Sequence, residues 1–272
     1  MTDHKADRKR TLADIKAFIT DMDGTLYVSD HVIPGAVEFI ALLRERGYPF
    51  LFLTNNSSAR AVTFRDRLRR LGIPAESEEI LTSGAATAHY LLQATSHRRI
   101  FLVGTPALRE EFIEAGFTLA DQGAADAVVL GFDKTLTYER LKRACLLVAE
   151  SAPYYATHPD FTCITDEGLI PDAGAFIEAI RSVTGRVPHI IGKPQAEIVE
   201  AALAKVGHPA EVTAMVGDQL DTDMTMANRA GLYGILVFTG ETSKRDAAKN
   251  RVITPDLLCS SVARLAERIR AL

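Results

Sequence analysis

Four aspartates of the 272-residue chain occur as two close pairs, each after a short apolar run. Asp21 and Asp23 form the first pair, and Asp218 and Asp223 form the second, with Asp221 between them as a third acid that we expect to be solvated. Carboxylates held this close repel one another unless they share a proton or a cation, and oxygen ligands favour Mg²⁺ over zinc. Gly24 permits a tight turn and the close approach of a ligand. The alternatives are an Asx turn at the first pair and an acidic helix N-terminus at the second.

Two further segments carry groups that suit an anion. Thr54 and Asn55 follow a second apolar run, where a hydroxyl, an amide and the N-terminus of the next helix favour negative charge. Plain capping of that helix by Ser57 or Ser58 is the alternative. Lys193 follows another apolar run and lies before the next predicted helix, so its side chain could reach the same sheet edge. The alternative is an ordinary surface lysine.

These residues are spaced along a chain in which predicted strands and helices alternate. Apolar runs predict strands at 16–20, 50–53, 79–83, 100–103, 127–130, 154–157, 190–191, 212–216 and 235–238. Helical spacing predicts helices at 34–47, 106–115, 138–150, 194–206, 219–230 and 256–270, and a basic helix that ends at 71–72. Residues 161–171 have the composition of a loop, and residues 1–14 that of a tail or a short helix. Regular alternation predicts an α/β fold with a parallel sheet covered on both faces, and ligands at the carboxyl ends of its strands.

Composition excludes several classes of protein. The chain has 31 Lys and Arg against 35 Asp and Glu, a net charge of −4 that does not favour nucleic-acid binding. Three widely spaced cysteines argue against a zinc site or a disulfide framework and fit a reducing cytosol. No apolar run approaches the roughly 20 residues of a membrane helix, and no secretory signal is visible. We therefore expect a cytoplasmic protein with neither nucleic acid nor membrane as a partner.

The order of the polar segments resembles the haloacid dehalogenase-like (HAD) superfamily over nearly the whole chain. The series is DxDGT at Asp21, TNN at Thr54, an isolated Lys193 and GDxxxTD from Gly217. The resemblance implies a Rossmann-like, doubly wound parallel-sheet core.

The spacing of these segments indicates the branch of that superfamily. Asp21 and Thr54 are 33 residues apart, whereas Thr54 and Lys193 are 139 residues apart. An inserted α/β cap domain therefore fits only between the second and third segments, as with the class IIA cap of the NagD-like, or p-nitrophenylphosphatase, branch. We expect residues 1–84 and 188–272 to form the core and 85–187 the cap. Dehalogenases of the superfamily lack the second aspartate, here Asp23.

The resemblance implies an Mg²⁺-dependent phosphomonoester hydrolase. Asp21 would be the nucleophile that forms an aspartyl-phosphate, and Asp23 the general acid and then the base. Mg²⁺ would be bound by a carboxylate oxygen of Asp21, the backbone carbonyl of Asp23, and Asp218. A phosphotransferase that uses the same aspartate, or a non-catalytic ligand-binding or regulatory protein of the same fold, is the alternative.

The remaining site residues would bind phosphate or select the substrate. Thr54, Asn55 and Lys193 would hold the phosphoryl oxygens, with Gly24 and Asp223 supporting the metal and the lysine. Five residues of the cap segment would select the leaving group: His158, Phe161, Cys163, Asp166 and Glu167. The substrates implied are small phosphorylated metabolites such as sugar phosphates, nucleoside monophosphates or p-nitrophenyl phosphate. Homodimers are common in that branch.

Overall fold

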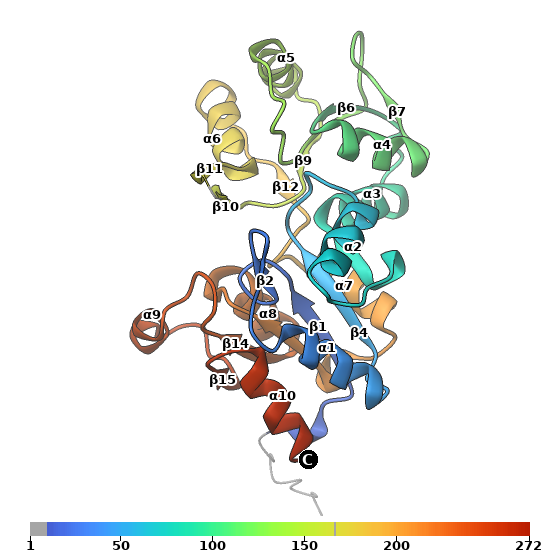
Figure 1. Cartoon of the computed structure of the whole chain (residues 1–272). Coiled ribbons are helices and arrows are strands. Elements are labelled where there is room, and N and C mark those ends of the chain that lie inside the picture. Colours follow the sequence, from blue (N-terminus) through green and yellow to red (C-terminus); the bar gives the residue numbers. More distant parts are fainter. Residues whose placement is uncertain (1–9, 166) are drawn as a thin grey trace, which may run out of the picture.

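The computed structural model describes residues 10–165 and 167–272, which form two units, each built on a parallel sheet (Figure 1). We call them the core unit and the cap unit. The core sheet has the order β15-β14-β13-β1-β4-β5 and the cap sheet the order β12-β9-β8-β6-β7. The core strands are β1 (Ala17–Asp21), β4 (Phe50–Thr54), β5 (Ile80–Thr82), β13 (Thr213–Gly217), β14 (Tyr233–Val237) and β15 (Leu257–Cys259).

Helices cover both faces of the core sheet because its central strands are apolar on both sides. All five residues of β1 are buried; Phe18 packs on one face and Ile19 on the other. One face is covered by α1 (Ala36–Glu45), α2 (Ala61–Arg70) and α10 (Val262–Arg270). The other is covered by α7 (Ala196–Val206) and α8 (Thr225–Ala230), with the start of α3 (Ser83–Ala94). The doubly wound α/β fold is therefore confirmed.

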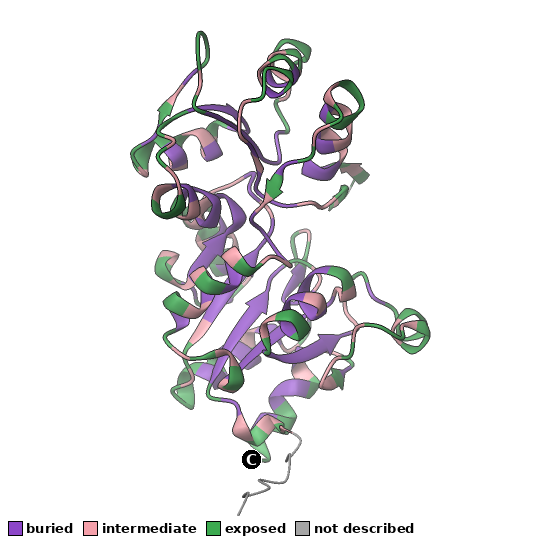
Figure 2. Cartoon of the chain, turned by 180° about the vertical axis from the view of Figure 1, so that it is seen from behind, coloured by how far each residue is buried: buried purple, intermediate pink, exposed green. Residues whose placement is uncertain are grey.

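The cap unit repeats this arrangement on a smaller scale. Its strands are β6 (Arg99–Val103), β7 (Thr118–Leu119), β8 (Ala127–Leu130), β9 (Tyr154–Ala156) and β12 (His189–Ile190). Helices α5 (Tyr138–Ala149) and α6 (Ala173–Thr184) pack on one face, and α4 (Pro106–Glu114) with the end of α3 on the other. The strands of both sheets are largely buried between their helices (Figure 2).

The boundary expected between residues 187 and 188 is wrong by a few residues. His189 and Ile190 pair with Tyr155 and Ala156 of β9, so they belong to the cap sheet. An apolar run of two residues does not reveal which of two sheets it joins. At the other boundary, α3 packs Ala86 on the core sheet and Leu91 on the cap sheet.

Three other local predictions are corrected. Residues 161–171, expected as a loop, form an antiparallel hairpin of β10 (Thr162–Thr165) and β11 (Gly168–Pro171). Helix α2 begins at Ala61 after Arg60, so Ser57 and Ser58 do not cap it. The expected last helix is preceded by β15, because a three-residue apolar strand fits a helical pattern equally well.

The remaining elements are short. They are a 3₁₀ turn (Leu12–Asp14), β2 (Tyr27–Val28), β3 (His31–Val32), 3₁₀ turns (Ser77–Glu79 and Ala210–Val212), a π-helical turn (Leu220–Met224) and α9 (Lys244–Lys249). Part of the expected N-terminal tail, residues 1–9, lies outside the described residues. Within the described part of the chain, no helix is long and apolar enough to cross a membrane.

Candidate active site

A pocket of about 560 Å³ lies between the carboxyl ends of the core strands and the hairpin β10–β11. Parallel strands end at one edge of their sheet, so the residues that follow them meet there. The predicted residues at this pocket are Asp21, Asp23, Gly24, Thr54, Asn55, Cys163, Lys193 and Asp218.

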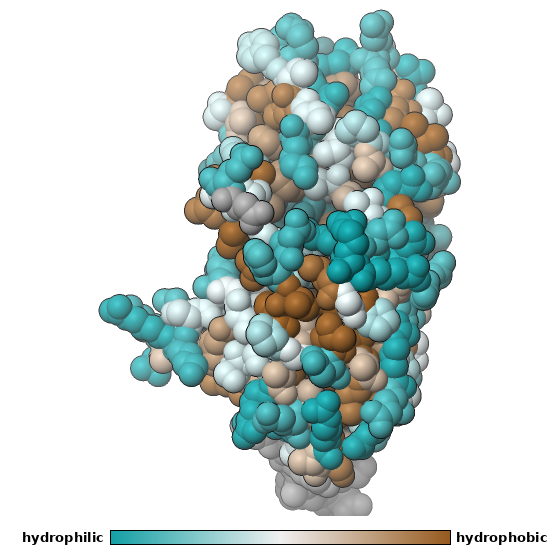
Figure 3. All heavy atoms as spheres, viewed as in Figure 1, coloured by the Kyte–Doolittle hydropathy of each residue, from teal (hydrophilic) through white to brown (hydrophobic). Residues whose placement is uncertain are grey.

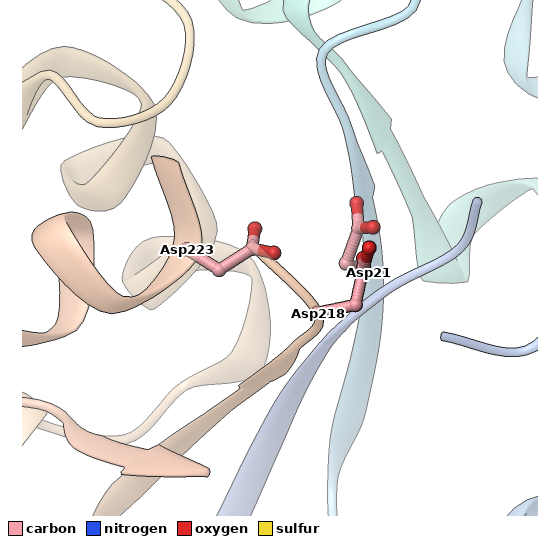
Figure 4. A group of neighbouring side chains, drawn as sticks. All are labelled: Asp21, Asp218 and Asp223. Carbon is pink, nitrogen blue, oxygen red and sulfur yellow. The ribbon is translucent and has the colours of Figure 1, made fainter. Parts of the chain in front are cut away.

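Three buried carboxylates, which we call the floor carboxylates, lie together at the site; Asp21 and Asp218 line the pocket and Asp223 does not. Ligand oxygens of Asp21, Asp218 and Asp223 lie within 4.8 Å of one another (Figure 4). Gly24 has a φ of +78°, and a Cβ there would lie 2.5 Å from Asp218 Oδ2, so a side chain would displace that carboxylate. The donors are all oxygens, which fits Mg²⁺. The Asp23 side chain is not part of this cluster; the predicted ligand there is its backbone carbonyl.

Lys193 compensates part of this negative charge. Its Nζ donates to Asp21 Oδ1 at 2.5 Å and to Asp223 Oδ1 at 2.7 Å. Burial lowers the pKa of Lys193, but its two carboxylate partners outweigh that effect and raise it. Burial raises the pKa of Asp21 well above its usual range, an effect that Lys193 partly offsets. Burial and the charge of Asp223 also raise the pKa of Asp218, to about 7. The cluster thus has more negative charge than one ammonium neutralises.

Asp23 is placed differently from the floor carboxylates. It is exposed at the pocket, where Tyr27 Oη donates to its Oδ2 at 3.4 Å. The Arg67 guanidinium lies over the Tyr27 ring, 4.6 Å from the centroid. Desolvation by the surrounding protein raises the pKa of Asp23, and the Arg67 charge partly offsets this. A carboxyl group with a raised pKa that faces a pocket is suited to donate a proton.

The two predicted phosphate-binding residues after β4 differ in what their side chains offer. Thr54 is buried, lines the pocket and accepts a hydrogen bond from Asn56 N at 3.0 Å, so its hydroxyl proton is available. The Asn55 amide is already occupied: it binds the backbone of Lys193 and the carboxylate of Asp160. Its side chain therefore binds protein groups in this structure, while the residue also lines the pocket.

The predicted substrate-selecting residues are mostly away from the pocket. His158 is fully buried, with Nε2 2.8 Å from Asp172 Oδ1, so its assignment to substrate contact is corrected. Phe161 and Glu167 are exposed and do not line the pocket, and Asp166 lies outside the described residues. Cys163 does line it; burial raises the pKa of this thiol to about 11, so it is neutral there.

Several pocket residues were missed by the sequence analysis. Asp160, Ile164 and Leu169 line the pocket from the cap unit, and Val28 lines it from the core unit. The apolar side chains are unusually exposed: Ile164 by 59% and Leu169 by 69%. Ile164 pairs with Leu169 across the hairpin, so both side chains point to one face. This pairing is invisible until 161–171 is recognised as a hairpin.

Comparisons with known proteins agree with this geometry. Residues 18–118 match the sequence model of the haloacid dehalogenase-like hydrolases, and residues 190–265 match a second, HAD hydrolase-like model. The 5′-nucleotidase YutF of Bacillus subtilis is 35% identical over 229 residues, covering 84% of this chain and 89% of that protein.

Solved structures give the same result. The 4-nitrophenylphosphatase of Thermotoga maritima is 44% identical with a TM-score of 0.89, covering 93% of this chain and 97% of that one. NagD from Escherichia coli K-12 is 34% identical with a TM-score of 0.85, covering 92% and 97%. The chain therefore belongs to the haloacid dehalogenase-like hydrolase family, as a phosphoric monoester hydrolase of its NagD-like branch.

Proposed function

We propose that this protein is an Mg²⁺-dependent phosphatase of small phosphorylated metabolites that works through an aspartyl-phosphate on Asp21. The observation that carries the proposal is the placement of the Asp21 carboxylate, held by Lys193 at the floor of a pocket that Asp23 also lines. Such an arrangement offers a nucleophile, a cation for the phosphoryl group and a proton donor on one cavity wall.

The residues that would hold Mg²⁺ are Asp21, Asp218 and the backbone carbonyl of Asp23. When bound, Mg²⁺ would neutralise phosphate charge and offset the repulsion among the floor carboxylates. The clustering of the three carboxylates supports this: burial raises the pKa of Asp21 and Asp218, and the neighbouring carboxylates raise both further, so a cation bound there would favour their ionised forms.

Hydrolysis then takes two displacements. A carboxylate oxygen of Asp21 attacks phosphorus, and the bond from phosphorus to the leaving oxygen breaks as Asp23 donates its proton to that oxygen. Asp23 then accepts a proton from the water that attacks the aspartyl-phosphate, which releases phosphate and restores Asp21. Lys193 Nζ and the Thr54 hydroxyl bind the phosphoryl oxygens throughout. Asp223 holds Lys193.

The test is phosphate release from a panel of phosphomonoesters, with Mg²⁺ and with EDTA. We expect release from several substrates with Mg²⁺ and its loss in EDTA. Absence of release from every substrate by folded protein with Mg²⁺ would contradict the proposal. Transfer to an added sugar or nucleoside, in place of release to water, would favour the phosphotransferase alternative. The cytoplasmic location and the homodimer stay predictions.

Asp23→Asn should lose activity in a way that depends on the leaving group. An amide cannot donate the proton that a poor leaving group requires, so the rate of the first displacement, measured in a single turnover, should fall about 10²–10⁴-fold for alkyl phosphates. Loss of the base in the second displacement slows all substrates alike, so steady-state kcat does not isolate the acid role. p-Nitrophenol leaves as a stable anion, so the loss should be much smaller for p-nitrophenyl phosphate. Equal losses for both substrates would contradict the role of Asp23 as the acid.

The wall opposite the carboxylates suggests which leaving groups fit. Exposed Ile164 and Leu169 face the pocket together with Val28, and apolar side chains gather beside this hairpin in Figure 3. Among the described residues that line the pocket, Lys193 is the only Lys or Arg, and Asp21 and Asp223 already pair with it. The pocket therefore favours a leaving group with an apolar face and no second negative charge.

Leu169→Lys should reverse part of this preference. A new ammonium at the wall should raise kcat/KM for a substrate that carries a carboxylate, relative to p-nitrophenyl phosphate, by about tenfold. Val183→Lys is the matched control, since Val183 is equally exposed on the cap unit but does not line the pocket. An unchanged ratio for Leu169→Lys would show that this wall does not contact the leaving group.

A further inference from the structure

Lys193 lies at the point where the chain passes from the cap sheet to the core unit. After β12, Ile191 N donates to Ala156 O at 3.1 Å and Gly192 N donates to Thr157 O at 2.8 Å. The next residue, Lys193, already places its ammonium on Asp21 in the core unit. A Cβ on Gly192 would lie 2.3 Å from Thr157 O, so this junction has no room for a side chain. These hydrogen bonds to the cap sheet therefore fix the backbone position from which the Lys193 side chain extends.

Asn55 holds Lys193 from the core side. Asn55 Oδ1 accepts from Lys193 N at 2.8 Å, and Asn55 Nδ2 donates to Lys193 O at 3.1 Å. One amide therefore binds both backbone polar groups of the lysine. Both residues are almost fully buried, Asn55 at 6% and Lys193 at 3% exposed, so these bonds are protected from water.

Asp160, from the loop between β9 and β10, determines which way this amide faces. Asn55 Nδ2 donates to Asp160 Oδ1 and Oδ2 at 3.2 and 3.1 Å. A carboxylate only accepts hydrogen bonds, so the nitrogen of the amide must point toward it. If the amide turned over, its oxygen would face the carboxylate, and both bonds to Lys193 would be lost. Gly174 N donates to Asp160 O at 2.8 Å, which ties Asp160 to helix α6 of the cap unit.

We propose that Asp160 is a positioning residue that acts through Asn55 to place Lys193 against Asp21. The docking of the cap unit on the core unit is thereby coupled to the assembly of the phosphate-binding group. The role of Lys193 in phosphate binding rests on the proposed function. The series of contacts from Asp160 through Asn55 to Lys193 is independent of it.

The first test compares three single variants. Asp160→Ala removes the acceptor, and a misplaced lysine should lower kcat by about 10²-fold with a much smaller change in KM. Asp160→Asn keeps an acceptor oxygen and should stay within about threefold of the unmodified protein. Glu178→Ala is the matched control, because it removes a partly exposed acid of the same unit that pairs only with Arg181 in the contacts described. The loss for Asp160→Ala should be equal for alkyl and aryl phosphates.

The second test is a double-mutant cycle. If Asp160 acts through Asn55, Asp160→Ala should cost less than about twofold once Asn55→Ala is present. The proposal would be overturned if the losses caused by Asp160→Ala and Asn55→Ala multiply in the double variant, if Asp160→Asn fails to retain activity, or if the loss depends on the leaving group. The last of these would make Asp160 a substrate contact.

A third measurement separates this proposal from the proposed function. Binding of inorganic phosphate in the presence of Mg²⁺, followed by calorimetry, needs no turnover. It should weaken about tenfold or more in Asp160→Ala and little in Asp160→Asn. The same affinity in both variants would overturn the proposal, even if no phosphomonoester is hydrolysed. Asp160→Ser, whose hydroxyl is too short to reach Asn55, should behave as Asp160→Ala does and replaces it if the alanine variant does not fold.

Discussion

Replacing Asp21 with asparagine is expected to abolish phosphate release, with a fall in kcat of at least about 10⁴-fold. A neutral amide is not a usable nucleophile toward phosphorus, and it supplies one less charge to the metal. The loss should be large for alkyl and aryl phosphates alike, because both need the same nucleophile for the first displacement. Single-turnover and steady-state assays of phosphate release measure this directly.

The Asp21→Asn protein should still fold, which makes the loss interpretable. Burial raises the pKa of Asp21, because its ionised carboxylate is unfavourable in the folded state. Its bond to Lys193 offsets part of this unfavourable free energy. Asparagine has nearly the same volume, and Lys193 keeps its bond to Asp223. We expect a melting temperature within a few degrees of that of the unmodified protein, which corresponds to a change of about 1 kcal/mol in the free energy of unfolding.

Two controls accompany this variant. Asp221→Asn removes an exposed acid that does not line the pocket and should leave kcat unchanged. Intact mass must exclude deamidation, which would regenerate Asp21. Turnover near that of the unmodified protein, with the amide intact, would show that Asp21 is not the nucleophile.

The floor of the site could be predicted from sequence because its geometry follows from the sheet. Strands β1 and β13 are buried on both faces, so they appear as apolar runs, and the aspartates at their carboxyl ends, Asp21 and Asp218, must meet at one edge. No long-range contact is needed to infer that Asp21 and Asp218 lie together.

The cap side of the pocket could not be predicted in the same way. The partner of Asn55 is 105 residues away, at Asp160, and nothing in the local pattern indicates it. His158 illustrates the same limit, because a histidine beside a pocket and one buried against Asp172 look alike in sequence. Residues 161–171 have mixed polarity because the hairpin β10–β11 is largely exposed, which removes the alternation that identifies a strand.

Lys193→Met is expected to lower kcat by about 10²–10³-fold and also to destabilise the metal-free protein. The ammonium is the direct partner of both Asp21 and Asp223, at 2.5 and 2.7 Å. Methionine fills most of its volume but leaves these buried carboxylates without their cation, a change that typically costs about 3–5 kcal/mol. Lys205→Met is the control, since Lys205 binds only a backbone carbonyl, that of Glu78, in the contacts described.

The stability lost in Lys193→Met should depend on pH and on Mg²⁺. Burial already raises the pKa of Asp21, and loss of Lys193, which lowers it, raises it further. A carboxyl group whose pKa is higher in the folded state stabilises the protein below its unfolded pKa, and that contribution is lost as pH rises. In EDTA, the variant should therefore melt closer to the unmodified protein at pH 5 than at pH 8. Mg²⁺ should restore part of the difference at pH 8, because an ion that binds only the folded site stabilises it. If the fall in melting temperature is the same at both pH values, with and without Mg²⁺, Lys193 contributes packing rather than charge to this site.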